Sequence, residues 1–281
     1  QIKLIMKNSQ KTVVVAMSGG VDSSVAALLL HNEGFNVIGV TMRLFPQNEE
    51  TNYSLNKSCC SLDDVEDARS VCRQIGAKHY YLNFEKEFNE HVVNYFISEY
   101  QKGRTPFPCL ACNDRLKFDF LLKRAEFMKA DYIATGHYAS IIETKNEYKL
   151  IKGIDETKDQ SYVLFNLTQN IMKKLKLPVG IFPKSEIRKI AEDHNLINAK
   201  KPDSQDICFI PDGDYKKFIN NKIDQKQGLI VDSEGNKLGN HSGIHNFTIG
   251  QRKGIGIESK GKPLFVTKIY PSKNIVEVGP A

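Results

Sequence analysis

The stretch TVVVAMSGGVDSS, residues 12–24, decides the fold that this chain is expected to adopt. Residues 12–17 form a β-branched run without a polar interruption, which is typical of a strand buried on both faces of a sheet. The two glycines allow a tight backbone turn. The segment VAALLLHNEG behind them has helical composition and ends at Gly34. This order of strand, glycine turn and helix predicts the first unit of an α/β domain.

Strand and helix patterns alternate along the chain after this stretch. Short apolar runs predict strands at 37–42, 78–82 and 131–135, and helical patterns separate them at 63–75, 85–100 and 114–129. Because parallel strands need crossover connections, which are usually helices, this alternation predicts a parallel, Rossmann-like sheet with right-handed crossovers.

The pattern changes after about residue 210. Glycine and asparagine then interrupt short apolar runs at 228–239, 243–257 and 262–279. Such runs, with turn sequences such as EGN and PSKN between them, predict short antiparallel strands. We therefore expect an α/β domain over residues 1–210 and a small β-rich domain over residues 211–281.

The composition is that of an ordinary globular protein with a mild basic bias. Hydrophobic residues make up 41% and charged residues 26% of the 281 positions, and the net charge is +6. This charge permits a polyanionic partner such as RNA without requiring one. No apolar run approaches the roughly 20 residues of a membrane helix, and no secretory signal is recognisable. A cytoplasmic protein with no membrane partner is expected.

The segment Ser18-Gly19-Gly20-Val21-Asp22-Ser23 carries the strongest chemical signal. A helix starting near Asp22 presents N–H groups and the positive end of its dipole to an anion, and Ser18 and Ser23 add hydroxyl donors. No Lys follows the glycines, so this is not a Walker-type loop. It suits pyrophosphate leaving an adenylated product better than γ-phosphoryl transfer. The competing interpretation is a turn whose glycines only relieve crowding, but the segment resembles the PP-loop of ATP pyrophosphatases.

Three cysteines form the second chemical signal. Cys109 and Cys112 make a CxxC after a proline-rich approach, and Cys208 lies in SQDICFI near the predicted domain boundary. If Asn113 or Asp114 capped the following helix, the helix N-terminus would lower the pKa of the Cys112 thiol. A zinc site would need a second pair of ligands. A sulfur relay needs two thiols that approach each other, and three thiolates could hold an iron–sulfur cluster.

The other cysteines give weaker signals. Without a secretory signal, the six cysteines are not expected to form a structural disulfide framework. Cys72 lies within a helical pattern and fits a small buried hydrophobe. The pair Cys59 and Cys60 stands beside a polar loop, and its role is left open.

Six segments, in order along nearly the whole chain, resemble the tRNA-specific 2-thiouridylases of the MnmA family. They are SGGVDSS, GRTPFPCLACNDRLKF, DYIATGHYA, KDQSYVL, KPDSQDICFI and FTIGQRKGIGI. Six matches in order are far more specific than any single motif. The resemblance implies a PP-loop domain like that of the adenine nucleotide α-hydrolases, followed by a small β-rich domain.

The resemblance also implies a reaction. ATP and Mg²⁺ activate the carbon-2 oxygen of a wobble uridine as its adenylate, and pyrophosphate leaves. Cys208 resembles the persulfide carrier, which a sulfur-relay protein loads, and Cys112 resembles the nucleophile that releases the sulfide as a Cys112–Cys208 disulfide forms. The positions that match ATP-binding residues are Ala16, Met17, Ser18, Gly19, Gly20, Val21, Asp22, Ser23, Met42 and Gly136.

Contacts to tRNA are implied at a further set of positions. These are Phe107, Pro108 and Cys109, which match the stretch that faces the target base, together with His137, Lys158, Asp159 and Gln160. A structural histidine is the competing interpretation for His137, and a solvated loop is the competing interpretation for 158–160. The basic pair Arg252 and Lys253 is equally well explained as a phosphate contact and as a solvated turn.

Two departures from the family pattern matter. Many members have Asp at the position of Cys109, so this chain has a third thiol with which Cys112 and Cys208 could hold an iron–sulfur cluster. The chain also stops at Ala281, about where the family's C-terminal β-barrel would begin, so this sequence is expected to be either a fragment or a member that lacks the barrel. The persulfide relay ranks first. The alternatives are a cluster-dependent thiolase of the same superfamily, another PP-loop synthetase, and a tRNA-binding protein without catalysis.

Overall fold

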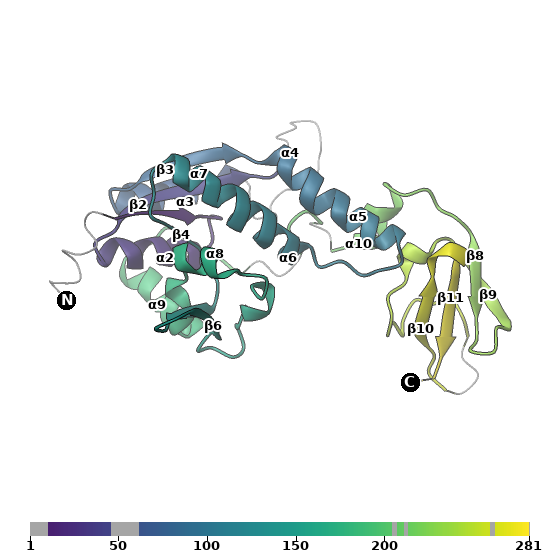
Figure 1. Ribbon diagram of the computed structural model, residues 1–281. Helices are drawn as coiled ribbons and strands as arrows, with labels where there is room; N and C mark the ends of the chain where they lie inside the picture. Colours follow the sequence, from purple (N-terminus) through teal and green to yellow (C-terminus); the bar gives the residue numbers. More distant parts are fainter. Residues whose placement is uncertain (1–10, 46–61, 204–206, 211–212, 259–261, 281) are drawn as a thin grey trace. The chain divides into compact units, whose positions relative to one another are not determined.

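The computed structural model describes residues 11–45, 62–203, 207–210, 213–258 and 262–280 (Figure 1). The chain divides into two compact units. Unit 1 comprises Gln1–Asn89 and Cys109–Pro211, and unit 2 comprises Glu90–Pro108 and Asp212–Ala281. Residues 90–108, which the predicted boundary assigns to the first domain, therefore group with the second unit.

A parallel sheet forms the centre of unit 1, as the sequence predicts. Its strand order is β3-β2-β1-β4-β7, and every adjacent pair is parallel. The strands are β1 (Thr12–Ala16), β2 (Asn36–Arg43), β3 (Lys78–Asn83), β4 (Tyr132–Ala134) and β7 (Leu175–Lys176). The middle strand, β1, is fully buried at Val13, Val14 and Val15, which is why its sequence is apolar at successive positions rather than alternating.

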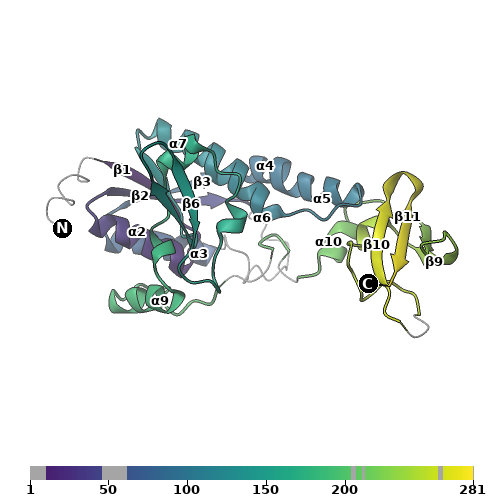
Figure 2. The ribbon, with the colours of Figure 1, turned by 60° about the horizontal axis from the view of Figure 1, so that its bottom comes forward.

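Helices cover both faces of this sheet. Helices α2 (Val21–Asn32), α3 (Leu62–Gln74) and α9 (Lys184–Asp193) enclose one core with alternate residues of β1, such as Val13 and Val15. Helix α7 (Leu121–Phe127) contacts β4 and lies on the opposite side of the sheet in Figure 2. This arrangement places the β1–α2 turn at the carboxyl edge of the sheet, where open α/β folds bind their ligands.

The helix that carries the CxxC starts earlier than the sequence predicts. Helix α6 (Pro108–Ala111) continues into the π-helical η2 (Cys112–Phe120) and then into α7. Pro108 stands at the first helical position, where its fixed φ angle and missing N–H cause no loss. Neither Asn113 nor Asp114 caps this helix, so the predicted helix start at residue 114 was wrong.

The remaining elements of unit 1 are short. They are α4 (Glu85–Phe88), the antiparallel hairpin β5 (Ala139–Glu143) and β6 (Tyr148–Lys152), η3 (Ser161–Val163), α8 (Gln169–Lys174) and η4 (Pro178–Ile181).

Unit 2 contains a four-stranded sheet of order β10-β11-β8-β9. Its elements are the π-helical η1 (Asn89–Val93, whose first residue belongs to unit 1), α5 (Asn94–Gln101), α10 (Tyr215–Asn220), β8 (Gly228–Val231), β9 (Lys237–His241), η5 (Ile244–Asn246), β10 (Phe265–Tyr270), η6 (Pro271–Lys273) and β11 (Ile275–Gly279). The predicted β-rich domain is confirmed, but β8 and β11 pair in parallel.

In unit 2, one predicted strand is missing and one predicted turn is present. Residues 243–257 form no strand; instead Ile244, Phe247 and Ile255 fill the core of the unit from a 3₁₀ turn and irregular backbone. The predicted PSKN turn is present, with Asn274 in the left-handed region at φ 52°. Within the described residues, no helix is both long enough and apolar enough to cross a membrane.

Candidate functional site

The loop between β1 and α2 has a backbone that its glycines make possible. Gly19 has φ +76°, and a Cβ there would lie 2.6 Å from Asp64 Cα. A side chain at this position is therefore excluded both by conformation and by space. Helix α2 starts at Val21, and its N-cap residue, Gly20, makes no side-chain capping hydrogen bond. The start of α2 thus presents backbone N–H groups, which suit an anion.

Hydrogen bonds within the loop fix its shape. The Ser23 hydroxyl donates to Gly20 O over 3.1 Å and accepts from the Ser18 N–H over 3.3 Å. The hydroxyl that the sequence suggested as a donor to an anion therefore also braces the turn. Gly136 packs directly against the loop, since a Cβ there would lie 2.7 Å from Ser23 N.

A buried asparagine that the sequence analysis missed holds the loop from outside. Asn198 is 3% exposed, and its Nδ2 donates to Gly19 O over 2.8 Å and to Ser24 Oγ over 2.9 Å. The carbonyl orientation of Gly19 therefore depends on a side chain about 180 residues away. No local pattern around residue 198 marks this role.

Asp22 lies at the centre of a partly buried polar cluster. Its Oδ1 accepts hydrogen bonds from the Tyr138 hydroxyl and from Lys184 Nζ, both over 2.7 Å. Burial, together with the hydrogen bond to Asp22, raises the pKa of Tyr138, so its hydroxyl remains a donor at neutral pH. Lys184 is only 11% exposed at its side chain and comes from the first turn of α9. The β1–α2 loop contains no Lys, but Lys184 of α9 lies beside it and contacts Asp22.

The cluster extends from Lys184 to Asp203. Asp203 Oδ1 pairs with Lys184 Nζ and with Arg188 NH2, each over 2.8 Å, and Asp203 Oδ2 pairs with Lys158 Nζ over 2.9 Å. Burial by itself would raise the pKa of Asp203, but hydrogen bonds from Lys184 and Lys158 outweigh it and lower the pKa to about 2. Asp203 is thus ionised at neutral pH. It is five residues before Cys208 in the sequence.

The two predicted catalytic cysteines lie on segments that share a neighbour. Cys112 is half-buried and opens the π-helical η2, a kind of helix that is frequent at functional sites. Cys208 is also half-buried, and the ring of the next residue, Phe209, packs edge-on against Phe88 of α4 at 5.7 Å. Helix α4 in turn contacts η2.

The start of η2 is anchored next to Cys112. The side chain of Asn113 is 3% exposed and donates to Val163 O over 3.1 Å. Val163 lies in η3, just after the predicted tRNA-binding residues 158–160. The cysteine helix and this loop are therefore held together within unit 1.

The other cysteines differ in their surroundings. Burial raises the pKa of Cys72 to about 11, and its Sγ contacts Met17 Sδ at 3.3 Å, so it is a protonated core thiol. Cys109 is exposed, whereas Cys59 and Cys60 lie outside the described residues. In the described part of the chain, no three His, Cys, Asp or Glu side chains are placed to hold a metal ion. An iron–sulfur cluster on Cys109, Cys112 and Cys208 is therefore not supported.

Residues predicted to bind tRNA have well-defined partners inside unit 1. His137 is 8% exposed and shares a 2.7 Å hydrogen bond with Thr135 Oγ1. Burial, with a contribution from the charge of Lys117, holds the pKa of His137 well below its usual range, so the ring is neutral at pH 7. This environment agrees with the structural interpretation of His137 and leaves little of its surface to contact RNA.

The loop over 158–160 is bonded to the protein, unlike a solvated loop. Asp159 accepts hydrogen bonds from the backbone N–H groups of Gly153 and Ser161. Gln160 Oε1 accepts from the Tyr138 N–H over 2.9 Å, which ties the loop to the residue that contacts Asp22. On the segment before Cys109, the Phe107 side chain is 39% exposed, whereas Pro108 is buried.

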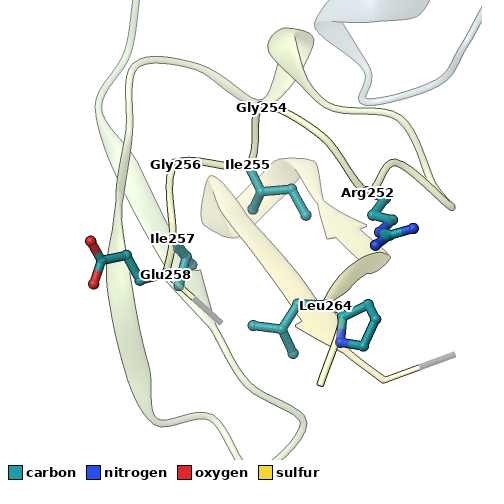
Figure 3. A pocket seen from close by; sticks show the side chains of 8 residues that line it. Arg252, Gly254, Ile255, Gly256, Ile257, Glu258 and Leu264 are labelled. Carbon is teal, nitrogen blue, oxygen red and sulfur yellow. The ribbon is translucent and has the colours of Figure 1, made fainter. Parts of the chain in front are cut away.

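A cavity of about 500 Å³ is formed by residues of unit 2. In Figure 3, Arg252 and Glu258 lie at opposite sides of it, with Ile255 and Leu264 between them. It is lined by Arg252, Gly254, Ile255, Gly256, Ile257, Glu258, Pro263 and Leu264. None of the predicted nucleotide-binding or catalytic residues contributes to its lining.

Comparison with known proteins gives consistent matches over most of the chain. Residues 11–212 match the family model described as "tRNA methyl transferase HUP domain", and residues 216–280 match the model described as "tRNA methyl transferase PRC-barrel domain". The names of these models refer to a methyl transfer reaction.

Similar proteins from three bacteria have a different name. The protein named "tRNA-specific 2-thiouridylase MnmA" from Acetivibrio thermocellus is 49% identical over 275 residues, which cover 96% of this chain and 76% of that protein. The protein "MnmA 1" from Thermoanaerobacter pseudethanolicus is 50% identical over 278 residues, with 98% and 76% covered. The MnmA of Clostridium acetobutylicum is 51% identical over 272 residues, with 96% and 76% covered.

Proposed function

The chain belongs to the MnmA family of tRNA-specific 2-thiouridylases, and on this premise we propose that it replaces the carbon-2 oxygen of a tRNA wobble uridine with sulfur at the expense of ATP. The observation that carries this proposal is that one unit holds both a glycine loop suited to pyrophosphate and two half-buried cysteines, on segments that each contact α4. Methyl transfer requires neither feature, whereas thiolation requires an activated oxygen and a sulfur carrier.

The loop at the start of α2 fits the phosphates of ATP. A Cβ at Gly20 would meet only Ser18 Oγ, at 3.4 Å, so a ligand has room to approach this backbone closely. The residues proposed to hold ATP are those of 16–23, with Met42 at the end of β2 and Gly136 against the loop. Mg²⁺ bound with ATP would neutralise charge on the phosphates.

The proposed reaction has two stages, adenylation of the uridine and then transfer of sulfur to it. The carbon-2 oxygen attacks the α-phosphate of ATP, and pyrophosphate leaves from the adenylated uridine. The Cys112 thiolate then attacks the inner sulfur of a Cys208 persulfide, which releases hydrosulfide and forms the Cys112–Cys208 disulfide. Hydrosulfide adds at carbon 2, and AMP leaves with the former carbonyl oxygen. A dithiol reductant returns two electrons to the disulfide.

The proposed partners are tRNA and a protein that donates a persulfide. Phe107, which is partly exposed, and Cys109 are proposed to contact the target base, and His137 and residues 158–160 are proposed to contact other parts of the tRNA. We place the chemistry in residues 1–210 and assign a supporting role to residues 211–281. Because ATP and tRNA are both cytoplasmic, we propose a cytoplasmic location.

The proposal is tested by single cysteine substitutions. Purified protein is incubated with ATP, Mg²⁺, unmodified tRNA and a persulfide donor, and nucleosides are analysed by mass spectrometry. We expect Cys112→Ser and Cys208→Ser each to lower 2-thiouridine formation at least a hundredfold while ATP affinity stays within threefold. Cys72→Ala is the matched control, because this thiol is buried and protonated at neutral pH.

Two outcomes would contradict the proposal. One is full thiolation by either serine variant with the persulfide donor. The other is a methylated nucleoside, formed with S-adenosylmethionine in place of ATP and persulfide, in the absence of any thiolation. The second outcome would favour the reaction named by the family models.

A further inference from the structure

A chain of charged side chains connects the nucleotide loop to the segment that precedes Cys208. Asp22 in the loop pairs with Lys184, and Lys184 pairs with Asp203, over 2.7 and 2.8 Å. Lys184 therefore lies between two carboxylates, one from each segment. Its side chain is 11% exposed, so this pairing is shielded from water more than ordinary surface ion pairs are.

The residues leading to Asp203 are held at several points. Arg188 donates to Ala199 O over 3.3 Å and to Lys201 O over 3.0 Å. Lys201 Nζ contacts carboxylate oxygens of Asp64 and Asp67, each over 2.6 Å. The backbone over 199–203 is therefore fixed to α9 and α3, and Asp203 adds an anchor to the nucleotide loop through Lys184.

Cys208 is only five residues after Asp203 in the sequence. Five residues span at most about 17 Å when fully extended, so the position of Asp203 limits how far the thiol can lie from Lys184. On the other side of Cys208, Phe209 is buried against Phe88. In the sequence, Cys208 therefore stands between Asp203, which pairs with Lys184 near the nucleotide loop, and Phe209, which packs on α4.

The charges of Asp22 and Lys184 explain why Asp203 is anchored at the nucleotide loop. Phosphates that bind at the start of α2 arrive beside Asp22, and Lys184 is the cation already in contact with that carboxylate. A sulfur donor is useful only when it lies close to the adenylated base. An anchor shared by the nucleotide loop and the persulfide-bearing segment meets this requirement.

We propose that Asp203 is a positioning residue for Cys208, acting through Lys184 to hold the persulfide-bearing segment beside the nucleotide loop. This inference rests on the proposed function. In this proposal Asp203 acts through Lys184 and not on the base or the sulfur, so its loss should leave adenylation in place and impair delivery of sulfur to the adenylated uridine.

The test measures two products of one reaction mixture. Wild-type protein and Asp203→Asn are incubated with ATP, Mg²⁺, unmodified tRNA and a persulfide donor, and both pyrophosphate, which reports adenylation, and 2-thiouridine are quantified. We expect Asp203→Asn to bind ATP within threefold of wild type and to form at least tenfold less 2-thiouridine per pyrophosphate. Asp203→Glu, which retains the charge, should regain at least half of the wild-type ratio.

A matched control separates positioning from general damage. Glu126→Gln removes a different ion pair of unit 1, the one with Lys174 at 2.7 Å, and should leave the product ratio unchanged. A variant that is merely less stable would lose pyrophosphate release and 2-thiouridine formation together, so the ratio of the two products would not change. If Asp203→Asn does not fold, as judged by its circular dichroism melting curve, Asp203→Ser takes its place.

A second readout does not depend on the reaction. The rate of Cys208 alkylation by iodoacetamide, followed by peptide mass spectrometry, should change at least threefold in Asp203→Asn, while the rate at Cys109 stays within twofold. If wild-type protein thiolates tRNA, a wild-type product ratio in Asp203→Asn overturns the inference. If wild-type protein does not thiolate at all, the proposed function fails, and an unchanged Cys208 alkylation rate then overturns the anchor separately.

Discussion

Asn198 shows how one side chain can set the shape of a binding loop from a distance. Its amide donates to the carbonyl of Gly19, the residue whose backbone has the left-handed conformation. Without this donor, the Gly19 carbonyl would be left with a lost hydrogen bond in a buried environment, which costs roughly 1–3 kcal/mol.

We predict that Asn198→Ala weakens ATP binding about tenfold, which corresponds to about 1.4 kcal/mol. Isothermal titration calorimetry with ATP measures the effect. Asn36→Ala is the control, because the Asn36 amide donates to Thr12 Oγ1 at the opposite end of β1 and should not change ATP affinity. Equal affinity in wild type and Asn198→Ala would show that the loop keeps its shape without this hydrogen bond.

Asp203 gives the stability of unit 1 a dependence on acid pH. Its pKa lies at about 2 in the folded protein against an ordinary value of 3.8. A carboxyl whose pKa is lowered by folding stabilises the protein fully above its unfolded pKa, and this stabilisation is lost as pH falls towards the folded pKa.

Between pH 6 and pH 3, wild-type protein should therefore lose about 1 kcal/mol more stability than Asp203→Asn. Urea unfolding at pH 6, 4 and 3 measures the difference. Parallel loss of stability in the two proteins over this range would mean that the Asp203 ion pairs contribute no net stabilisation.

Local sequence identified the residues of the loop but not the residues that support it. Gly19 and Gly20 were recognisable because a tight turn between strand and helix requires them. Lys184 and Asn198 were not, because their partners in the loop lie more than 160 residues away in the sequence. The interactions of Asp203 were equally invisible, although the residue lies within the KPDSQDICFI segment that the sequence analysis quoted.

At the scale of the element, the turn between β1 and α2 and the turn after α3 separate conformational from steric constraints on glycine. Gly19 and Gly76 have similar φ angles, +76° and +70°. A Cβ at Gly19 would meet the backbone of Asp64, whereas a Cβ at Gly76 would meet nothing within 4 Å.

We predict that Gly76→Ala costs about 1 kcal/mol, the strain of a left-handed alanine. Gly19→Ala should cost at least about 2 kcal/mol more, because the Asp64 backbone must also move, and it should abolish measurable ATP binding. Urea unfolding and ATP titration of both variants provide the comparison. Similar unfolding free energies for the two would show that the backbone near Asp64 yields easily.

The elements themselves were predictable where periodicity is strong. The run VVVAM at 13–17 is apolar at every position, and the central strand β1 forms over Thr12–Ala16, as expected. Residues 243–257 were misjudged, because short apolar runs separated by glycine and asparagine are typical of strands, whereas Ile244, Phe247 and Ile255 reach the core of unit 2 from a 3₁₀ turn and irregular backbone. The parallel pairing of β8 with β11 was also unpredictable, since it joins strands that are more than 40 residues apart.

At the scale of the whole molecule, unit 2 depends on a helix from the middle of the chain. Tyr100 of α5 stacks on Tyr215 of α10 with ring centroids 5.4 Å apart, and Phe96 lies 6.3 Å from Phe218. Tyr100 is 5% exposed, and burial raises the pKa of its hydroxyl to about 12. A boundary drawn from sequence alone could not assign this helix, because its apolar face gives no sign of its partner.

We predict that Tyr100→Ala destabilises unit 2 by about 3 kcal/mol, which is typical of truncating a buried aromatic side chain. Amide hydrogen exchange within 213–280 should then accelerate about a hundredfold, while exchange in β1 stays unchanged. Tyr95→Ala on the same helix, where the side chain is 38% exposed, is the control. Equal acceleration in both units would indicate that they unfold as one.

Because unit 2 is formed by two separate segments of the chain, it cannot be separated from unit 1 in a simple way. Its two pieces meet the rest of the chain at 89/90, 108/109 and 211/212, so a single cut cannot remove it. Two of these junctions lie within four residues of a proposed reactive sulfur: Cys112 is four residues after Pro108, and Cys208 is three residues before Pro211. Trimming the molecule to its nucleotide-binding half would therefore disturb both thiols, and a split or permuted enzyme is better opened in the β5–β6 hairpin.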